Sequence, residues 1–272
     1  MDTTHLLTAN SQTRRLLEAA RSQKLQKLRR LSLIAGILHL IQGIIVLWLS
    51  QHLTIAITGS YLQFSRSARM LKPATTTIFR VDLPWLIALF FFLSAFFHLV
   101  IVSVYNKRYN INLRRGINKA RWVEYSLSAS VMMVAIAMLV GVYDLASLLM
   151  LFGLTAIMNL MGLMMELHNQ TTPATNWTSY YIGCLAGALP WGVVALYLWL
   201  GATYGSRAPT FVYWIFVSLF VFFSCFAVNM LLQYKKIGPW KDYLYGERVY
   251  ILLSLVAKSL LAWQVFAGTL RP

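Results

Sequence analysis

Hydrophobic side chains along this chain gather into long continuous runs instead of alternating with polar ones. A membrane-spanning helix needs about 20 consecutive apolar residues, and seven runs are long enough. They lie at residues 31–50, 83–105, 119–141, 145–167, 178–202, 209–233 and 245–269. Because most connections between them are short, a single domain is expected. The pattern predicts an all-α membrane protein, a bundle of seven transmembrane helices.

The connection after the first run is longer than the others and has a different pattern. Two segments rich in β-branched residues, TIAITGSYLQF and ATTTIFRV, flank a polar stretch that contains Pro73. Such residues favour strands, and a polar stretch with proline favours a turn. We therefore expect an extracellular β-hairpin loop between helices 1 and 2 that caps the outer face of the bundle.

The composition agrees with a membrane protein. Of the 272 residues, 58% are hydrophobic and 12% are charged, which lies outside the range of soluble globular domains. The formal net charge of +16 would favour nucleic acid only if the cations shared one exposed face. Here a membrane separates them, so we expect a lipid bilayer as the environment and no nucleic-acid partner.

Lysine and arginine are distributed unevenly between the two ends of the predicted helices. One end carries sixteen, of which seven lie in residues 1–30, six in 105–121 and three in 234–244, whereas the other end carries six. Connections rich in lysine and arginine stay in the cytoplasm. This predicts a multi-pass protein of the cell membrane with a cytoplasmic N-terminus and an extracellular C-terminus.

The first thirty residues differ from the rest of the chain. They are polar and basic and lack the apolar core of a signal peptide. We divide the chain into a basic cytoplasmic segment, 1–30, and a seven-helix membrane domain, 31–270. The leucines among the cations of residues 11–30 allow a short interfacial helix, and a solvated basic leader is the alternative.

Few ionisable side chains remain inside the predicted spans. Lys258 lies near the middle of the last span, where a lysine costs about 2.5–3.5 kcal/mol on insertion scales. Glu124 lies in the third span, within reach of the long lysine side chain, so the two charges can neutralise each other. One interpretation is a structural ion pair. The other is a lysine that forms a Schiff base with a conjugated aldehyde, for which Glu124 supplies the counter-carboxylate.

Two histidines and a second glutamate also fall within the spans. His39, His98 and Glu124 each lie nine residues from a basic residue at the same end, roughly 13 Å deep at 1.5 Å per residue. They form either a shared polar pocket that takes a proton or a set of separate core side chains. Glu166, near the end of the fourth span, is expected at the cytoplasmic interface. Cys184 and Cys225 have no metal ligands at suitable spacing and are expected to be small buried side chains.

Seven spans with a lysine in the last and a carboxylate on the third resemble the retinal-binding rhodopsins. The segments SLVAKSLLAWQ around Lys258 and RWVEYSLS around Glu124, together with the inverted orientation, resemble the heliorhodopsin family in particular. The resemblance covers all seven helices. It implies all-trans-retinal bound to Lys258 as a protonated Schiff base, with Glu124 as its counterion. It also implies a homodimer, a slow photocycle, and His39 and His98 in a proton-accepting cavity on the cytoplasmic side.

The light-driven proton pumps of the wider microbial rhodopsin group differ at two informative positions. Their second counterion carboxylate lies four residues before the lysine, where this chain has Ser254, and their internal proton donor is replaced by Ala135. Arg121 matches their helix 3 arginine, and Ser128, one turn after Glu124, is placed to hydrogen-bond it. The comparison implies that Glu124 is the sole counterion and that a relay carboxylate is missing.

Individual positions along the helices predict the lining of the retinal slot and one site of close helix contact. The predicted lining includes Tyr125, Ser254, Phe223, Met158 and Tyr180, with Phe223 standing where the pumps have a tryptophan. The segment GCLAG of the fifth helix, with Gly183 and Gly187, lets a helix backbone approach closely. That neighbour is either a second subunit or another helix of the same bundle.

Three function classes follow from these residues. The first is a light-sensing photoreceptor that pumps no ions and signals to a cytoplasmic partner protein. The second is a light-driven ion or proton transporter or channel; against it, the outer halves of helices 3 and 7 offer only Gln264 as a strongly polar side chain. The third, a secondary transporter without retinal, lacks the expected repeat and broken helices. No catalytic, metal or nucleotide constellation can be assembled, so we expect no enzyme.

Overall fold

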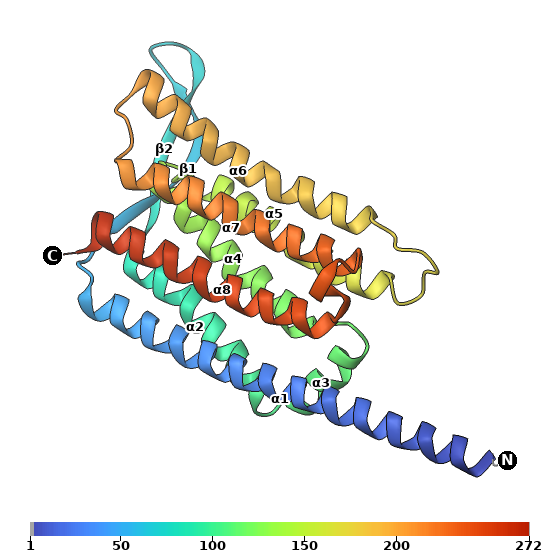
Figure 1. The fold of residues 1–272 in the computed structure, drawn as a ribbon. Coiled ribbons are helices and arrows are strands. Elements are labelled where there is room, and N and C mark those ends of the chain that lie inside the picture. Colours follow the sequence, from blue (N-terminus) through green and yellow to red (C-terminus); the bar gives the residue numbers. More distant parts are fainter. Residues whose placement is uncertain (1–2, 272) are drawn as a thin grey trace.

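The computed structural model describes residues 3–271, with side chains from Gln12 onward. Within this part of the chain, seven helices are long and apolar enough to cross a membrane, and they run alongside one another as a bundle (Figure 1). These are α1 (Thr3–Leu49), α2 (Leu83–Val102), α4 (Lys119–Leu139), α5 (Leu145–His168), α6 (Thr178–Tyr204), α7 (Thr210–Tyr234) and α8 (Tyr243–Val265). All seven predicted spans are confirmed.

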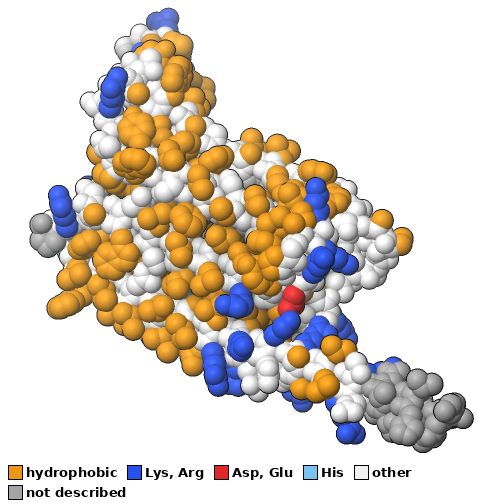
Figure 2. All heavy atoms as spheres, viewed as in Figure 1, with side chains coloured by type: hydrophobic (Ala, Val, Ile, Leu, Met, Phe, Trp, Pro, Cys, Tyr) orange, Lys and Arg blue, Asp and Glu red, His pale blue; other side chains and the backbone are white. Residues whose placement is uncertain are grey.

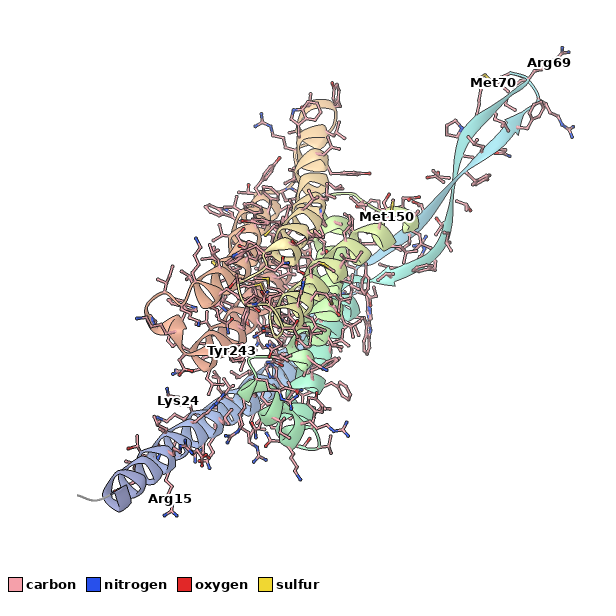
Figure 3. All side chains as sticks on the ribbon, turned by 90° about the vertical axis from the view of Figure 1, so that its right-hand side faces the viewer. Arg15, Lys24, Arg69, Met70, Met150 and Tyr243 are labelled. Atoms are coloured by element: carbon pink, nitrogen blue, oxygen red, sulfur yellow. The ribbon has the colours of Figure 1, made fainter. Side chains whose placement is uncertain are left out.

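The predicted hairpin is also confirmed. Strands β1 (Thr54–Ser65) and β2 (Met70–Asp82) pair antiparallel, and Arg69 adopts a positive φ in the turn between them. The base of the hairpin is bound to the bundle, because the Thr58 N–H donates to the Tyr143 carbonyl at 2.9 Å. Its tip projects beyond the helices, as Arg69 and Met70 show in Figure 3. The expectation that the hairpin caps the outer face therefore holds only for its base.

Two short helices were not predicted as separate elements. Helix α3 (Asn106–Arg114) occupies the connection between α2 and α4, and a 3-10 turn (Gly238–Lys241) precedes α8. A π-helical turn (Phe266–Leu270) extends α8 at its C-terminal end. The residues of α3 are mostly polar and too few to span a membrane, so a search for long apolar runs passes over them.

The two ends of the bundle differ in what they carry. The hairpin and the C-terminus lie at one end, which we call the hairpin end, and α3 and the N-terminal part of α1 lie at the other, the N-terminal end (Figure 1). Most lysine and arginine side chains visible in Figure 2 gather near the N-terminal end. This is the charge asymmetry that the sequence indicates.

Helix α1 continues through the basic segment without a break. It has 47 residues, which corresponds to about 70 Å and far exceeds the thickness of a bilayer. Leu25 and Leu28 are buried against Tyr109 and Leu113 of α3, and the Lys24 ammonium pairs with Asp242 at 2.7 Å. The segment is therefore not a separate short helix but the continuation of α1, and apart from Leu25 and Leu28 its described side chains are exposed, as expected for a solvated basic segment.

Apolar and polar side chains divide the interior of the bundle into two halves. The largest apolar cluster fills the half near the hairpin end, with fully buried residues such as Phe90, Met133, Ile136 and Val265. The buried charged side chains lie at mid-depth or toward the N-terminal end. This division places the candidate site at the boundary between an apolar and a polar half.

A buried group of three charged side chains joins α4, α5 and α8 in the polar half. Arg121 donates to Glu166 at 2.6 Å and to Glu247, and the backbone N–H of Asn118 donates to Glu166 at 2.7 Å. Glu166 is only 1% exposed, so the expectation that it lies at the interface is wrong. We call Arg121, Glu166 and Glu247 the charged triad. A cation between two carboxylates lowers the cost of burying either of them.

Replacing Arg121 by leucine is predicted to destabilise the fold by about 3–5 kcal/mol, because two buried carboxylates would face each other without a compensating cation. Denaturant unfolding in detergent measures this loss. The matched control is Arg115→Leu, an exposed arginine directly after α3, which should change stability by less than about 0.5 kcal/mol. Equal unfolding midpoints for the two variants would contradict the structural role of the triad.

Candidate functional site

Lys258 and Glu124 form a buried ion pair at the centre of the bundle. The Lys258 Nζ lies 2.9 Å from Glu124 Oε1, and the two residues are 2% and 3% exposed. Lys258 also donates to Ser254 Oγ, one turn earlier on α8, at 2.6 Å. The structure thus brings together the cation and the carboxylate that the sequence singled out.

Two serine hydroxyls fix the carboxylate of Glu124. Ser128 donates to Oε1 at 2.7 Å from the next turn of α4, as the sequence predicted, and Ser94 of α2 donates to the same oxygen at 2.6 Å. Sequence reasoning missed Ser94. It is a lone hydroxyl in an aromatic run, one turn before His98, and that spacing was the available signal. The donors stabilise a negative charge at this oxygen.

The two histidines lie together next to the pair. Their rings stack, with centroids 5.8 Å apart. His39 is fully buried, and neither of its ring nitrogens has a hydrogen-bond partner; the Nδ1 of His98 is also without one. Buried polar atoms normally find partners, so three ring nitrogens without one set these histidines apart from ordinary core side chains.

A small polar cavity extends from Glu124 toward the charged triad. Its volume is about 20 Å³, and its lining includes Ser32, His98, Glu124, Arg121 and Glu247. A cavity of this size with several polar partners can hold a water molecule. Glu124, the histidines and the triad therefore belong to one polar region on the N-terminal side of Lys258.

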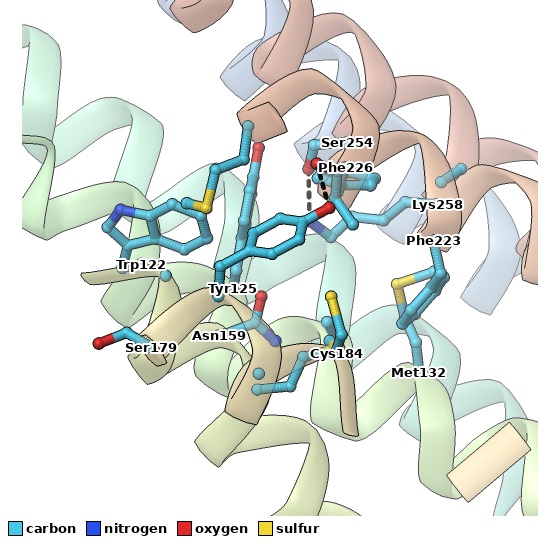
Figure 4. A pocket seen from close by; sticks show the side chains of 18 residues that line it. Trp122, Tyr125, Met132, Asn159, Ser179, Cys184, Phe223, Phe226, Ser254 and Lys258 are labelled. Atoms are coloured by element: carbon cyan, nitrogen blue, oxygen red, sulfur yellow. Dashed lines mark hydrogen bonds between the residues drawn. The ribbon is translucent and has the colours of Figure 1, made fainter. Parts of the chain in front are cut away.

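A larger, apolar cavity lies on the other side of the Lys258 side chain (Figure 4). Of the predicted lining residues, the structure places six around it: Lys258, Ser254, Tyr125, Met158, Tyr180 and Phe223. Glu124 and Ser128 do not line this cavity. The pair thus stands between an apolar slot and a polar region.

Several lining residues were not predicted. Trp122, Met132, Asn159, Phe226 and Met230 complete much of the wall. Asn159 is a buried amide within the apolar α5, and that isolation in the sequence was a usable signal. The aromatic and thioether residues carry no such signal, because the same side chains fill ordinary helix contacts. Cys184 also lines the cavity and is exposed, and Cys225 is partly exposed, so the expectation of two buried cysteines is wrong.

The glycines of GCLAG face another helix of the same bundle. A Cβ atom on Gly183 would lie 3.2 Å from Met161 Cβ, and one on Gly187 would overlap the sulfur of Met158. Both methionines belong to α5. The interpretation of this motif as a subunit contact is therefore wrong, and its role is to let α5 and α6 approach each other beside the cavity.

The lining fits a conjugated aldehyde such as retinal. Lys258 is the one charged side chain among the described lining residues, and aromatic and methionine side chains form most of the wall. An amine at the edge of an apolar slot, with a carboxylate 2.9 Å away, has the chemistry needed to hold an aldehyde covalently and to balance the positive charge.

Comparison with known proteins agrees with this geometry. The chain matches the model of the heliorhodopsin family over residues 28–270. No curated protein matches it in sequence. The fold is similar to the light-driven proton pump LR (Mac) from Leptosphaeria maculans, with a TM-score of 0.61 and 15% identity over 89% of this chain and 96% of that chain.

A second similar structure is cyanorhodopsin from the cyanobacterium Tolypothrix sp. NIES-4075, with a TM-score of 0.53 and 14% identity over 85% of this chain and 93% of that chain. At these identities the likeness concerns the fold alone, whereas the family match covers most of the sequence. The chain therefore belongs to the heliorhodopsin family and is a retinal-binding, multi-pass microbial rhodopsin.

Proposed function

We propose that the protein is a light-sensing photoreceptor that carries all-trans-retinal on Lys258, pumps no ions and signals to a cytoplasmic partner protein. The observation that supports this most directly is the position of the Lys258 amine, between the apolar cavity and the carboxylate of Glu124. Retinal, bound as a protonated Schiff base, supplies the absorption of visible light and the change of shape that follows it.

Glu124 is the proposed sole counterion. It is the only carboxylate within ion-pair distance of Lys258 among the described residues, and Ser254 occupies the position of the pumps' second carboxylate. Ser94 and Ser128 donate to its oxygen and spread the negative charge. One carboxylate with two hydroxyl donors is sufficient to balance one buried positive charge.

The polar region beside the pair is the proposed proton acceptor. Glu124 lies nearest to the Lys258 nitrogen, and the open ring nitrogens of His98 and His39 lie beyond it. A proton leaving the lysine nitrogen can move among these three groups and return. Ala135 offers no carboxylate to speed the return, which supports a slow photocycle.

The apolar half of the bundle favours sensing over transport. A pump needs a polar path on both sides of the lysine, and the hairpin half of the described core consists of one continuous apolar cluster. Gln264, the strongly polar side chain of this half, accepts a hydrogen bond from the Ser218 hydroxyl at 3.3 Å. On the other side, the charged triad separates the histidines from the N-terminal end.

Orientation and assembly complete the proposal. The charge bias supports an N-terminus in the cytoplasm and a C-terminus outside, so the polar region faces the cytoplasmic half of the bilayer. A homodimer is also proposed, although the glycines of α6 are used within the bundle. The projecting α1 and α3 then form the face available to a cytoplasmic partner.

The direct test of this function is the visible spectrum of the protein purified with all-trans-retinal. We predict an absorption band in the visible range for the native chain and none for Lys258→Ala, because the other described lysines lie outside the cavity. Circular dichroism should show that the variant keeps its helices. A visible band in a folded Lys258→Ala protein would contradict the attachment site.

Glu124→Gln tests the counterion. Removing the nearby negative charge disfavours the protonated nitrogen, so the pH midpoint at which the visible band is lost should fall, and a large fraction should absorb at shorter wavelength at neutral pH. The titration is done without halide, because a bound anion can replace the carboxylate. Glu18→Gln, an exposed carboxylate, serves as the control. If the pH midpoint for loss of the visible band is unchanged in Glu124→Gln, another residue is the counterion.

Light is predicted to drive no net ion transport. Illuminated liposomes containing the protein should show no sustained pH change, because the described residues offer a proton released from the lysine nitrogen no polar path to the hairpin end. A proton pump reconstituted in the same way is the positive control. A persistent pH shift that an uncoupler abolishes would move the protein to the transporter class while leaving the retinal site intact.

A further inference from the structure

A second polar cavity opens at the N-terminal end of the bundle, apart from the retinal site. Its volume is about 290 Å³. It lies between the connection from α5 to α6, the end of α7 and the 3-10 turn before α8, and Figure 3 shows Tyr243, one of its wall residues, near the same end as Lys24. The proposed photochemistry does not use this cavity.

The charges of its wall have one sign. Lys236 and Lys241 line the cavity, and no aspartate or glutamate does so. Within the described part of the chain, neither lysine ammonium group has an ion pair or a hydrogen bond, and Lys236 is held only by its backbone N–H, which donates to the Gln233 carbonyl at 3.2 Å. Asp242, the carboxylate next to Lys241, is already paired with Lys24 at 2.7 Å. Two free ammonium groups at a concave polar surface attract an anion.

Hydrogen bonds fix most of the remaining polar wall. Asn169 accepts from the Asn176 N–H at 2.7 Å and from the Thr172 hydroxyl. Gln233 donates to the Tyr243 carbonyl, and the Trp240 indole donates to Asn229 at 2.6 Å. A wall held in this way keeps its shape without a ligand. The two lysine ammonium groups are the charged donors that remain for a bound group.

The backbone of Lys236 supports a role for its side chain. It adopts φ +53° directly after the C-cap of α7, a left-handed conformation in which glycine is strongly favoured. The chain has lysine there despite the backbone strain. Glycine at this position should therefore suit the fold at least as well, which makes Lys236→Gly a variant that removes the charge without threatening stability.

Tyr243 connects this cavity with the retinal site through three contacts. Its ring lines the cavity and its hydroxyl donates to Glu166 at 3.0 Å. Glu166 accepts from Arg121 at 2.6 Å, and the Arg121 guanidinium lies 4.3 Å from the ring centre of Trp122, which lines the retinal cavity. A change at Tyr243 can thus reach the wall around the chromophore.

We propose that this cavity binds the phosphate or carboxylate group of a small anionic ligand through Lys236 and Lys241. We further propose that ligand binding is coupled to the retinal site through Tyr243 and the charged triad. The binding part stands independently, whereas the coupling part rests on the proposed photoreceptor function. The anionic group can belong to a free compound or to a lipid headgroup, which has the same chemistry.

Calorimetric titration in the dark tests the binding. Inorganic phosphate and citrate are titrated into the full chain in nanodiscs of phosphatidylcholine. We expect saturable binding that weakens at least tenfold in Lys236→Gly and is unchanged in Lys235→Ala, an exposed lysine outside the cavity. No saturable binding of either anion, or equal affinity in Lys236→Gly and the native chain, would overturn the site.

Nanodiscs that also contain phosphatidylglycerol distinguish the two sources. If the cavity binds a lipid headgroup, phosphate should bind the native chain more weakly in these discs than in phosphatidylcholine discs. The difference between the two kinds of disc should disappear in Lys236→Gly. Equal binding in both kinds of disc would assign it to a free compound. Because neither measurement uses light, a protein without photoreceptor function would still give the binding result.

The coupling is tested on the retinal-bound protein. Saturating citrate should change the decay rate of the light-induced absorbance at least twofold in the native chain. Tyr243→Phe keeps the ring in the cavity wall but loses the bond to Glu166, so it should retain citrate binding and lose this change. A full citrate effect in Tyr243→Phe, or no effect in a native chain that binds citrate, would overturn the coupling and leave the binding site standing.

Discussion

One buried pair of opposite charges, Lys258 and Glu124, constrains the rest of this structure. Neither charge is tolerated alone in the middle of a bilayer, and at 2.9 Å each compensates the other. The pair requires α4 and α8 to face each other at a depth where the long lysine side chain reaches the carboxylate. The apolar cavity and the polar region then fall on opposite sides of the same nitrogen, which is the arrangement that a retinal protein requires.

The polar side chains extend from this pair in one direction only. The histidines, the small cavity and the charged triad follow one another toward the N-terminal end, whereas the hairpin half is closed by apolar packing. In the proposed function, a proton therefore moves locally and does not cross the bundle. The same asymmetry places the charged triad and the proposed proton acceptors in the half of the bundle that ends at α3 and at the proposed anion cavity.

The sequence predicts most of the fold because the bilayer imposes simple rules on it. Long apolar runs give the spans, and the rarity of charge inside them singles out Lys258 and Glu124. The β-branched segments give the hairpin. These features depend on local pattern and depth, which are readable without knowing how the helices pack.

The features that the sequence does not predict depend on contacts between distant segments. Glu166 and Glu247 lie near the ends of spans, and only the position of Arg121 shows that they are buried. The basic part of α1 remains helical because Leu25 and Leu28 pack against α3, a helix too short and polar to be recognised. Likewise, Gly183 and Gly187 allow close approach in either a dimer or a bundle, and only the packing against Met158 and Met161 decides between them.

Reductive trapping tests the central claim most directly. Borohydride converts the bond between retinal and its lysine into a stable amine, and mass spectrometry of the digested protein then locates the attached group. The account predicts a single retinyl adduct, on the peptide that contains Lys258. An adduct on any other lysine, or a coloured protein without an adduct at Lys258, would contradict it.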